Sequence, residues 1–181
     1  MKNIVLLGDS ITYGFPYGEK ASWGADLEKA FPGFRFINQG INGDTFWGMY
    51  QRLERDVFDE EASLCIVMGG LNDLFNGQGL EEIFHNLQNI LNALKKKNII
   101  PVIGIPVSVF LDEMSRKEVR QLQEKTREKA SSNQIFTIDF SFLEKNDYSD
   151  GVHPNHQGYR KMGEKAVEGL KELFNLSQIR S

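Results

Sequence analysis

The chain has 181 residues, of which 40% are hydrophobic, and this combination is typical of one compact domain with a sizeable core. The composition excludes an intrinsically disordered protein, and the net charge of −4 gives no electrostatic case for binding nucleic acid. A single cysteine, Cys65, excludes an internal disulfide framework and a multi-cysteine metal site. Its apolar neighbours indicate a buried structural residue.

Neither a signal peptide nor a membrane-spanning segment is predicted. The first apolar run stops at Gly8, which makes it too short for the hydrophobic region of a signal peptide. No stretch reaches the length that a membrane span needs. We therefore expect a cytoplasmic protein, without membrane insertion, that forms one domain over residues 1–181.

Short apolar runs and helical patterns alternate along the whole chain. The runs predict β-strands over residues 3–8, 34–38, 64–68, 99–105 and 134–139. The helical patterns cover residues 22–31, 45–55, 80–97, 113–131 and 154–174. This alternation favours a parallel sheet covered on both faces. The predicted fold is therefore α/β, a single-domain flavodoxin-like three-layer αβα sandwich with a five-stranded parallel sheet.

Polar fragments follow four of the predicted strands. Gly8-Asp9-Ser10 ends the first strand, Gly43 follows the second, and Asn72 follows the third. Asp150 and His153 lie in the loop after the last strand. Because ligands of such sheets bind outside the carboxyl ends of the strands, we expect all four fragments to meet at one edge.

Together the fragments contain the groups that an acyl-transfer hydrolase needs. A serine hydroxyl needs a base, and the neutral imidazole of His153 is suited to take the proton from Ser10. Asp150, three residues earlier, can hold the other ring nitrogen. The N–H groups of Ser10 and Gly43 and the amide of Asn72 could stabilise an oxyanion. Each fragment alone is weak evidence, since Asp and Ser also cap helices and glycine also occupies turns.

The four fragments resemble the four sequence blocks of the SGNH hydrolases, also called the GDSL esterase/lipase family. The resemblance spans residues 8–154 in the order of the family, with Ile11 after the serine as a mild variation. It implies a flavodoxin-like fold and hydrolysis of esters or thioesters without a metal or cofactor. By matching position it also implies that Ser10 is the nucleophile, His153 the base and Asp150 the residue that orients it. The implied oxyanion hole consists of the N–H groups of Ser10 and Gly43 and the side chain of Asn72.

The same residues allow two other readings. A non-catalytic flavodoxin-like module could bind a phosphate or flavin at the turn after Gly8, but Asp9 would then place an acidic group beside the anion. Asp150, His153 and His156 could be metal ligands, but the sequence offers no evident fourth ligand.

Aromatic residues near the expected site are the candidate lining of a substrate pocket. Phe15, Trp47 and Phe110 are as consistent with an acyl pocket as with the core. The connection over residues 74–79 is too short for a lid domain, which favours a small-molecule acyl ester as the substrate. The sequence leaves the oligomeric state open.

Overall fold

The computed structural model describes residues 2–177, so residues 1 and 178–181 of the predicted domain lie outside the described part of the chain. One five-stranded sheet with strand order β2-β1-β3-β4-β5 forms the centre of the molecule, and all of its strand pairs are parallel. The strands are β1 (Lys2–Gly8), β2 (Phe34–Gly40), β3 (Ala62–Met68), β4 (Ile100–Ile105) and β5 (Phe136–Asp139). The order is the flavodoxin-like one, which confirms the predicted fold.

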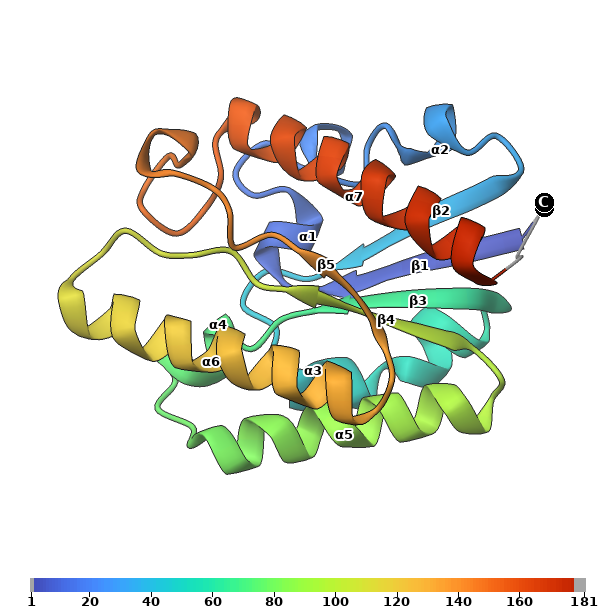
Figure 1. Cartoon of the computed structure of the whole chain (residues 1–181), viewed down its shortest axis with the longest axis horizontal. Coiled ribbons are helices and arrows are strands. Elements are labelled where there is room, and N and C mark those ends of the chain that lie inside the picture. Colours follow the sequence, from blue (N-terminus) through green and yellow to red (C-terminus); the bar gives the residue numbers. More distant parts are fainter. Residues whose placement is uncertain (1, 178–181) are drawn as a thin grey trace.

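Helices cover both faces of the sheet (Figure 1). On one face lie α2 (Leu27–Ala30) and α7 (His156–Ser177). On the other lie α3 (Phe46–Gln51), α5 (Leu80–Lys96) and α6 (Glu113–Ser132). The three-layer αβα arrangement is therefore confirmed. Of the helices between residues 2 and 177, none combines the length and hydropathy of a membrane span.

The core lies on both sides of the central strands. Residues 4–7 of β1 are at most 1% exposed, as expected for a strand that helices cover on each face. Cys65 on β3 is fully buried, as predicted, and this burial raises the pKa of its thiol. One apolar stripe of α5 packs onto the sheet and consists of Ile83, Leu87, Ile90, Leu91 and Leu94.

Two predicted helices are shorter than expected. The pattern over 22–31 forms a helix only at α2, after a 3₁₀ turn, η1 (Glu19–Ala21). Gly24 passes so close to β1 that a Cβ there would overlap the side chain of Leu6, and the chain between η1 and α2 makes turns instead. The pattern over 45–55 divides into α3 and a π-helical turn, η2 (Glu54–Phe58). Periodicity cannot reveal either interruption, because the apolar residues keep the helical spacing.

Two short helices that the sequence did not predict follow β1 and β3 directly. They are α1 (Ser10–Tyr13) and α4 (Leu71–Phe75). The side chain of Asp9 caps α1 by accepting a hydrogen bond of 2.9 Å from the N–H of Ile11. A third short element, the 3₁₀ turn η3 (Lys145–Asp147), precedes the loop that enters α7. These sharp turns keep polar residues at the edge of the sheet.

A close approach between α1 and the end of β2 fixes the position of α1. A Cβ at Gly40 would overlap the backbone nitrogen of Tyr13, so only glycine fits there. The side chain of Asn38 also donates a hydrogen bond of 2.8 Å to the carbonyl of Thr12. The helix that begins at Ser10 is therefore held against β2 at two points.

Replacing Gly40 by alanine should destabilise the protein by about 1–3 kcal/mol, because the overlap is with backbone that cannot rotate away. Gly79→Ala is the matched control, since a Cβ at Gly79 meets no atom within 4 Å. Urea denaturation followed by circular dichroism measures both changes. Equal free energies of unfolding for the two variants would contradict the close approach.

Candidate active site

Ser10, His153 and Asp150 form a continuous chain of side-chain contacts at the carboxyl edge of the sheet. The Oγ of Ser10 lies 3.1 Å from Nε2 of His153. Nδ1 of His153 lies 2.8 Å from Oδ2 of Asp150. Ser10 opens α1 directly after β1, and the other two residues lie in the loop that precedes α7. The structure therefore brings these three predicted site residues together.

The loop around Asp150 holds its carboxylate in one orientation. Oδ1 accepts hydrogen bonds of 2.9 Å from the N–H of Val152 and 2.7 Å from the N–H of His153. Burial raises the pKa of Asp150, but the bonds from His153 and Val152 outweigh it and hold the pKa below its ordinary value. An ionised Asp150 accepts from Nδ1–H of His153, which leaves Nε2 as the acceptor that faces Ser10.

Aromatic rings pack beside His153 in this loop and beside His156 at the start of α7. Phe15 lies against His153 with ring centroids 4.7 Å apart. Tyr17 stacks on His156 at 3.7 Å, and its hydroxyl lies 3.0 Å from Oγ of Ser149. Between residues 2 and 177, no group of three His, Cys, Asp or Glu side chains is arranged to hold a metal ion.

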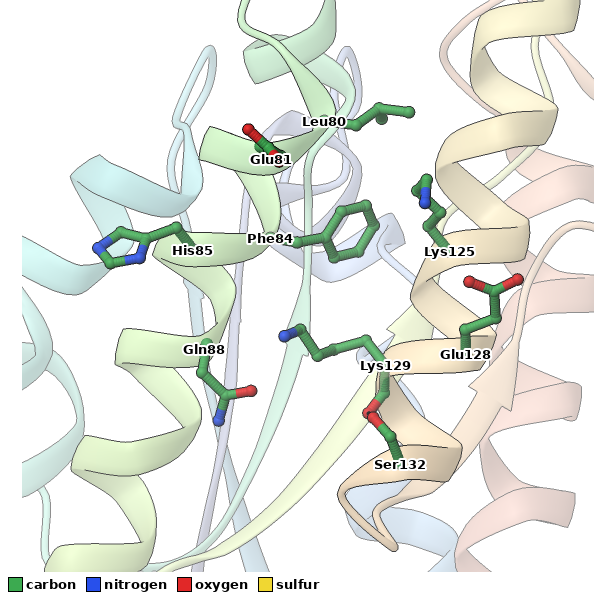
Figure 2. A pocket seen from close by; sticks show the side chains of 9 residues that line it. All are labelled: Leu80, Glu81, Phe84, His85, Gln88, Lys125, Glu128, Lys129 and Ser132. Carbon is green, nitrogen blue, oxygen red and sulfur yellow. The ribbon is translucent and has the colours of Figure 1, made fainter.

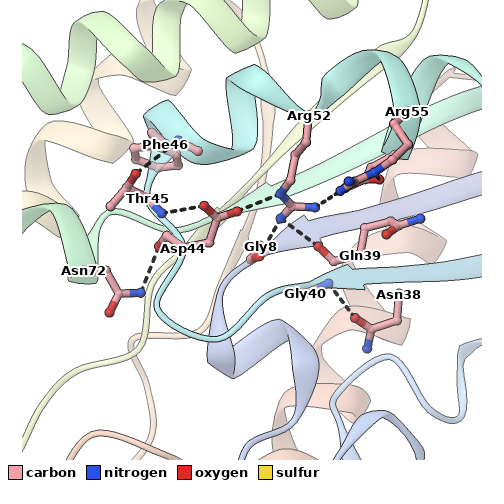
Figure 3. Close-up of polar contacts among 12 residues, drawn as sticks. Gly8, Asn38, Gln39, Gly40, Asp44, Thr45, Phe46, Arg52, Arg55 and Asn72 are labelled. Atoms are coloured by element: carbon pink, nitrogen blue, oxygen red, sulfur yellow. Dashed lines mark hydrogen bonds and ion pairs between the residues drawn. The ribbon is translucent and has the colours of Figure 1, made fainter.

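Three hydrogen-bond donors predicted for an oxyanion hole come from the segments that follow β1, β2 and β3. The N–H groups of Ser10 and Gly43 donate to no acceptor among the described residues. Gly43 has a φ of 76° inside a turn that the N–H of Asp44 closes on the carbonyl of Ile41, at 3.1 Å. Asn72 donates one amide hydrogen to the carbonyl of Asp44 at 2.9 Å (Figure 3). Its other amide hydrogen has no acceptor within residues 2–177.

A cavity of about 270 Å³ opens beside Ser10. Ser10, Asn72 and His153 lie in its wall together with apolar residues that the sequence did not single out. The full lining is Asp9, Ser10, Ile11, Leu71, Asn72, Phe75, Leu111, Ser115, Val152 and His153. Phe75 ends α4, which follows β3, and Leu111 follows β4. Their position after a strand was the one signal in the sequence that could have placed them in the cavity wall.

The three aromatic residues predicted for the pocket lie elsewhere or at its rim. Trp47 is 51% exposed beside Tyr50, and Phe110 packs against Tyr148 with ring centroids 5.1 Å apart. Neither is among the residues that line the cavity at Ser10. Phe15 is not in that lining either, but it contacts His153. The spacing along the chain does not reveal which of these rings enters the cavity wall.

A larger cavity of about 640 Å³ lies between α5 and α6 (Figure 2). Phe84 projects into it from α5, where His85 also belongs to its lining, and Lys125 and Lys129 border it from α6. None of the site residues predicted from the sequence is among its lining. The chemistry that the sequence predicts is therefore associated with the smaller cavity.

Two carboxyl groups are buried directly beneath the candidate site. Asp9 is 2% exposed, and burial, together with the nearby charges of Asp44 and Asp73, raises its pKa to about 7. Asp73 is fully buried, and burial raises its pKa to about 6 although the N–H of Phe46 donates to both of its oxygens. A raised pKa favours the protonated form in the folded state, so both groups oppose folding as the pH rises.

Asp9→Asn should stabilise the protein at high pH. The asparagine oxygen can still accept the bond from Ile11, but no charge has to be buried. The stability from the protonated Asp9 is fully present below the unfolded pKa near 3.8 and is lost as the pH rises through about 7. The advantage of the variant should therefore grow by about 2–3 kcal/mol between pH 5 and pH 8.

Urea denaturation at both pH values measures this advantage. Asp73→Asn is the internal comparison, and its gain should level off about one pH unit lower because its pKa is about 6. If the free energies of unfolding of Asp9→Asn and the wild type differ by the same amount at both pH values, the raised pKa of Asp9 is contradicted.

Comparisons with known proteins identify the family of the chain. The family model of the GDSL-like lipase/acylhydrolase family matches residues 6–161. A protein assigned to the G-D-S-L family from Desulfitobacterium hafniense DCB-2 is 23% identical with a TM-score of 0.84, over 93% of this chain and 99% of that one. A G-D-S-L family lipolytic protein from Veillonella parvula DSM 2008 is 25% identical with a TM-score of 0.81, over 93% and 97%.

The psychrotrophic esterase EstA from Pseudoalteromonas sp., inhibited by monoethylphosphonate, is 16% identical with a TM-score of 0.83. The alignment covers 97% of this chain and 100% of EstA. No curated protein sequence matches the chain. Since the family model covers most of the chain, this protein belongs to the GDSL-like lipase/acylhydrolase family, and it is an esterase or acylhydrolase.

Proposed function

We propose that the protein hydrolyses small carboxylic esters, or thioesters of the same size, through an acyl-enzyme intermediate on Ser10. The observation that carries this proposal is the unbroken relay from Asp150 through His153 to Ser10, which ends at an open cavity. Both contacts have hydrogen-bond distances, 3.1 Å and 2.8 Å, before any substrate binds.

In the first half of the reaction, Oγ of Ser10 attacks the carbonyl carbon of the ester. The hydroxyl proton passes to Nε2 of His153, and ionised Asp150 stabilises the resulting imidazolium. A tetrahedral intermediate forms, in which the former carbonyl oxygen carries the negative charge. When it collapses, the bond to the alcohol oxygen breaks and His153 returns the proton to that oxygen.

In the second half, water replaces the alcohol. His153 takes a proton from the water while the oxygen of the water attacks the acyl carbon of the ester on Ser10. Collapse of the second intermediate breaks the bond to Oγ, which regains its proton from His153. The products are a carboxylic acid and the free serine, so the relay ends in its starting state.

The unpaired donors give the oxyanion its stabilisation in both halves. The N–H groups of Ser10 and Gly43 and the free amide hydrogen of Asn72 have no protein acceptor within residues 2–177. Donors that are already oriented stabilise developing charge without reorganisation. The proposal assigns them to the oxygen of the tetrahedral intermediate.

The cavity favours a short acyl group. Its volume of about 270 Å³ is below the roughly 300–1,000 Å³ of ordinary small-molecule sites. Phe75, Leu111 and Val152 give it an apolar wall that suits a hydrocarbon chain rather than a charged one. The alternative of a phosphate-binding module is disfavoured, because the buried carboxyl of Asp9 occupies the turn where an anion would bind.

A serine-directed fluorophosphonate should add covalently to Ser10 in a ratio of one to one, because the relay makes this hydroxyl nucleophilic. Intact-mass analysis followed by peptide mapping measures the addition. Ser10→Ala, the control, should gain no mass and should not hydrolyse p-nitrophenyl acetate. Hydrolysis by Ser10→Ala at the wild-type rate would end the assignment of the nucleophile.

Asn72→Ala should lower kcat by about 10²–10³-fold with KM little changed, because the lost hydrogen bond strengthens only as charge develops. Asn76→Ala is the matched control, since Asn76 lies at the exposed end of the same helix, α4, and outside the cavity lining. Steady-state kinetics with p-nitrophenyl esters measures both variants. A kcat near wild type in Asn72→Ala would remove this amide from the oxyanion hole.

A further inference from the structure

We infer that Arg52 is the positioning residue of the oxyanion hole, holding in place the backbone and side-chain groups that stabilise the intermediate. This inference rests on the proposed function. Arg52 follows α3 and is only 9% exposed, and its guanidinium contacts four separate acceptors (Figure 3). They are Asp44 Oδ2 at 2.7 Å, Asp56 Oδ2 at 2.7 Å, the carbonyl of Gly8 at 3.0 Å and the carbonyl of Gln39 at 2.9 Å.

The first link runs to the nucleophile. Gly8 is the last residue of β1, and its carbonyl accepts both from Nη2 of Arg52 and from the N–H of Ile41, at 3.0 Å each. Gln39 is the next-to-last residue of β2, the strand that pairs with β1, so one guanidinium joins the carboxyl ends of two neighbouring strands. Ser10 follows Gly8 by two residues, and the position of its N–H depends on where β1 ends.

The second link runs to Gly43. Its turn begins at Ile41, whose N–H is tied to the Gly8 carbonyl, and ends at Asp44, whose N–H donates to Ile41. The carboxylate of Asp44 bonds Nε of Arg52 through one oxygen and the N–H of Thr45, at 2.9 Å, through the other. Arg52 therefore holds the turn at both ends, at Ile41 through the shared Gly8 carbonyl and at Asp44 directly. These two ends orient the N–H of Gly43 between them.

The third link runs to Asn72. Its amide donates to the backbone carbonyl of Asp44, the same residue whose side chain Arg52 holds. A shift of Asp44 would move the acceptor that orients the Asn72 amide. All three proposed donors thus depend on one cation that has no contact with the cavity beside Ser10 among the described residues.

Only arginine has the geometry for this task. Its planar guanidinium offers five N–H donors in fixed directions, whereas lysine concentrates three donors at a single atom. Arg55, three residues along the chain, is the natural contrast, because its side chain is 71% exposed and Asp56 is its one ion-pair partner within residues 2–177. Both arginines bind the buried carboxylate of Asp56, but only Arg52 reaches the loops of the site.

The test compares Arg52→Gln with Arg55→Gln in the full chain. For Arg52→Gln, kcat on p-nitrophenyl acetate should fall about 10²-fold, because the donors of the oxyanion hole would no longer be in position. The KM should stay within about twofold of the wild-type value. The rate at which a fluorophosphonate labels Ser10 should fall by a similar factor, because that reaction also develops charge on an oxygen. Arg55→Gln should leave kcat unchanged, and Arg52→Lys should fall between wild type and Arg52→Gln.

Circular dichroism at the assay temperature establishes that each variant is folded. If Arg52→Gln does not fold, Asp44→Asn decides, because it keeps the backbone carbonyl that binds Asn72 but weakens the contact with Arg52. A folded Arg52→Gln with wild-type kcat and a lower Tm, or with a raised KM alone, would overturn the inference while the proposed function stands. If the wild-type protein shows no ester hydrolysis that depends on Ser10, the proposed function is overturned, and the inference with it.

Discussion

The register of the central strands sets where the chemistry can occur. Gly8 at the end of β1 pairs with Gly40 of β2 and with Met68 of β3, so three segments leave the sheet at the same level. Neighbouring strands lie about 5 Å apart, and each segment needs only a few residues to return toward the same point. Short turns at this edge are therefore enough to gather groups that are far apart in the sequence.

Charge is buried beneath this edge at a cost to stability. Asp9 and Asp73 have raised pKa values, and Asp44 adds repulsion to both. The cation of Arg52 lies between the carboxylates of Asp44 and Asp56, and the exposed Arg55 also pairs with Asp56. Buried ion pairs seldom stabilise a fold more than well-packed apolar residues do. The cluster is better explained by the geometry that it fixes than by the free energy of unfolding.

The long elements were predictable from the sequence, and the short ones were not. Apolar runs located all five strands, and amphipathic spacing located α5, α6 and α7 to within a few residues. α1 and α4 are a turn or so long, so they leave no periodic signal. The relay from Asp150 to Ser10 followed from residue types and loop positions, and its geometry agrees. The cavity wall did not follow, because the directions of Phe75, Leu111 and Trp47 depend on local backbone turns.

The interruption after α3 shows why positioning groups are harder to predict than reacting ones. A reacting group can be recognised in the sequence from its residue type and spacing, as the Asp150 and His153 pair can. Arg52 has no such signal, because the sequence shows it as one more charged residue on an amphipathic helix. Its burial depends on the end of α3 and on the π-helical turn that follows, where Asp56 faces back toward the guanidinium at 2.7 Å. Such turns are rare, and they are frequent at functional sites. Because the turn brings a buried anion to a buried cation, the carbonyl groups of Gly8 and Gln39 gain a donor that no helical pattern indicates.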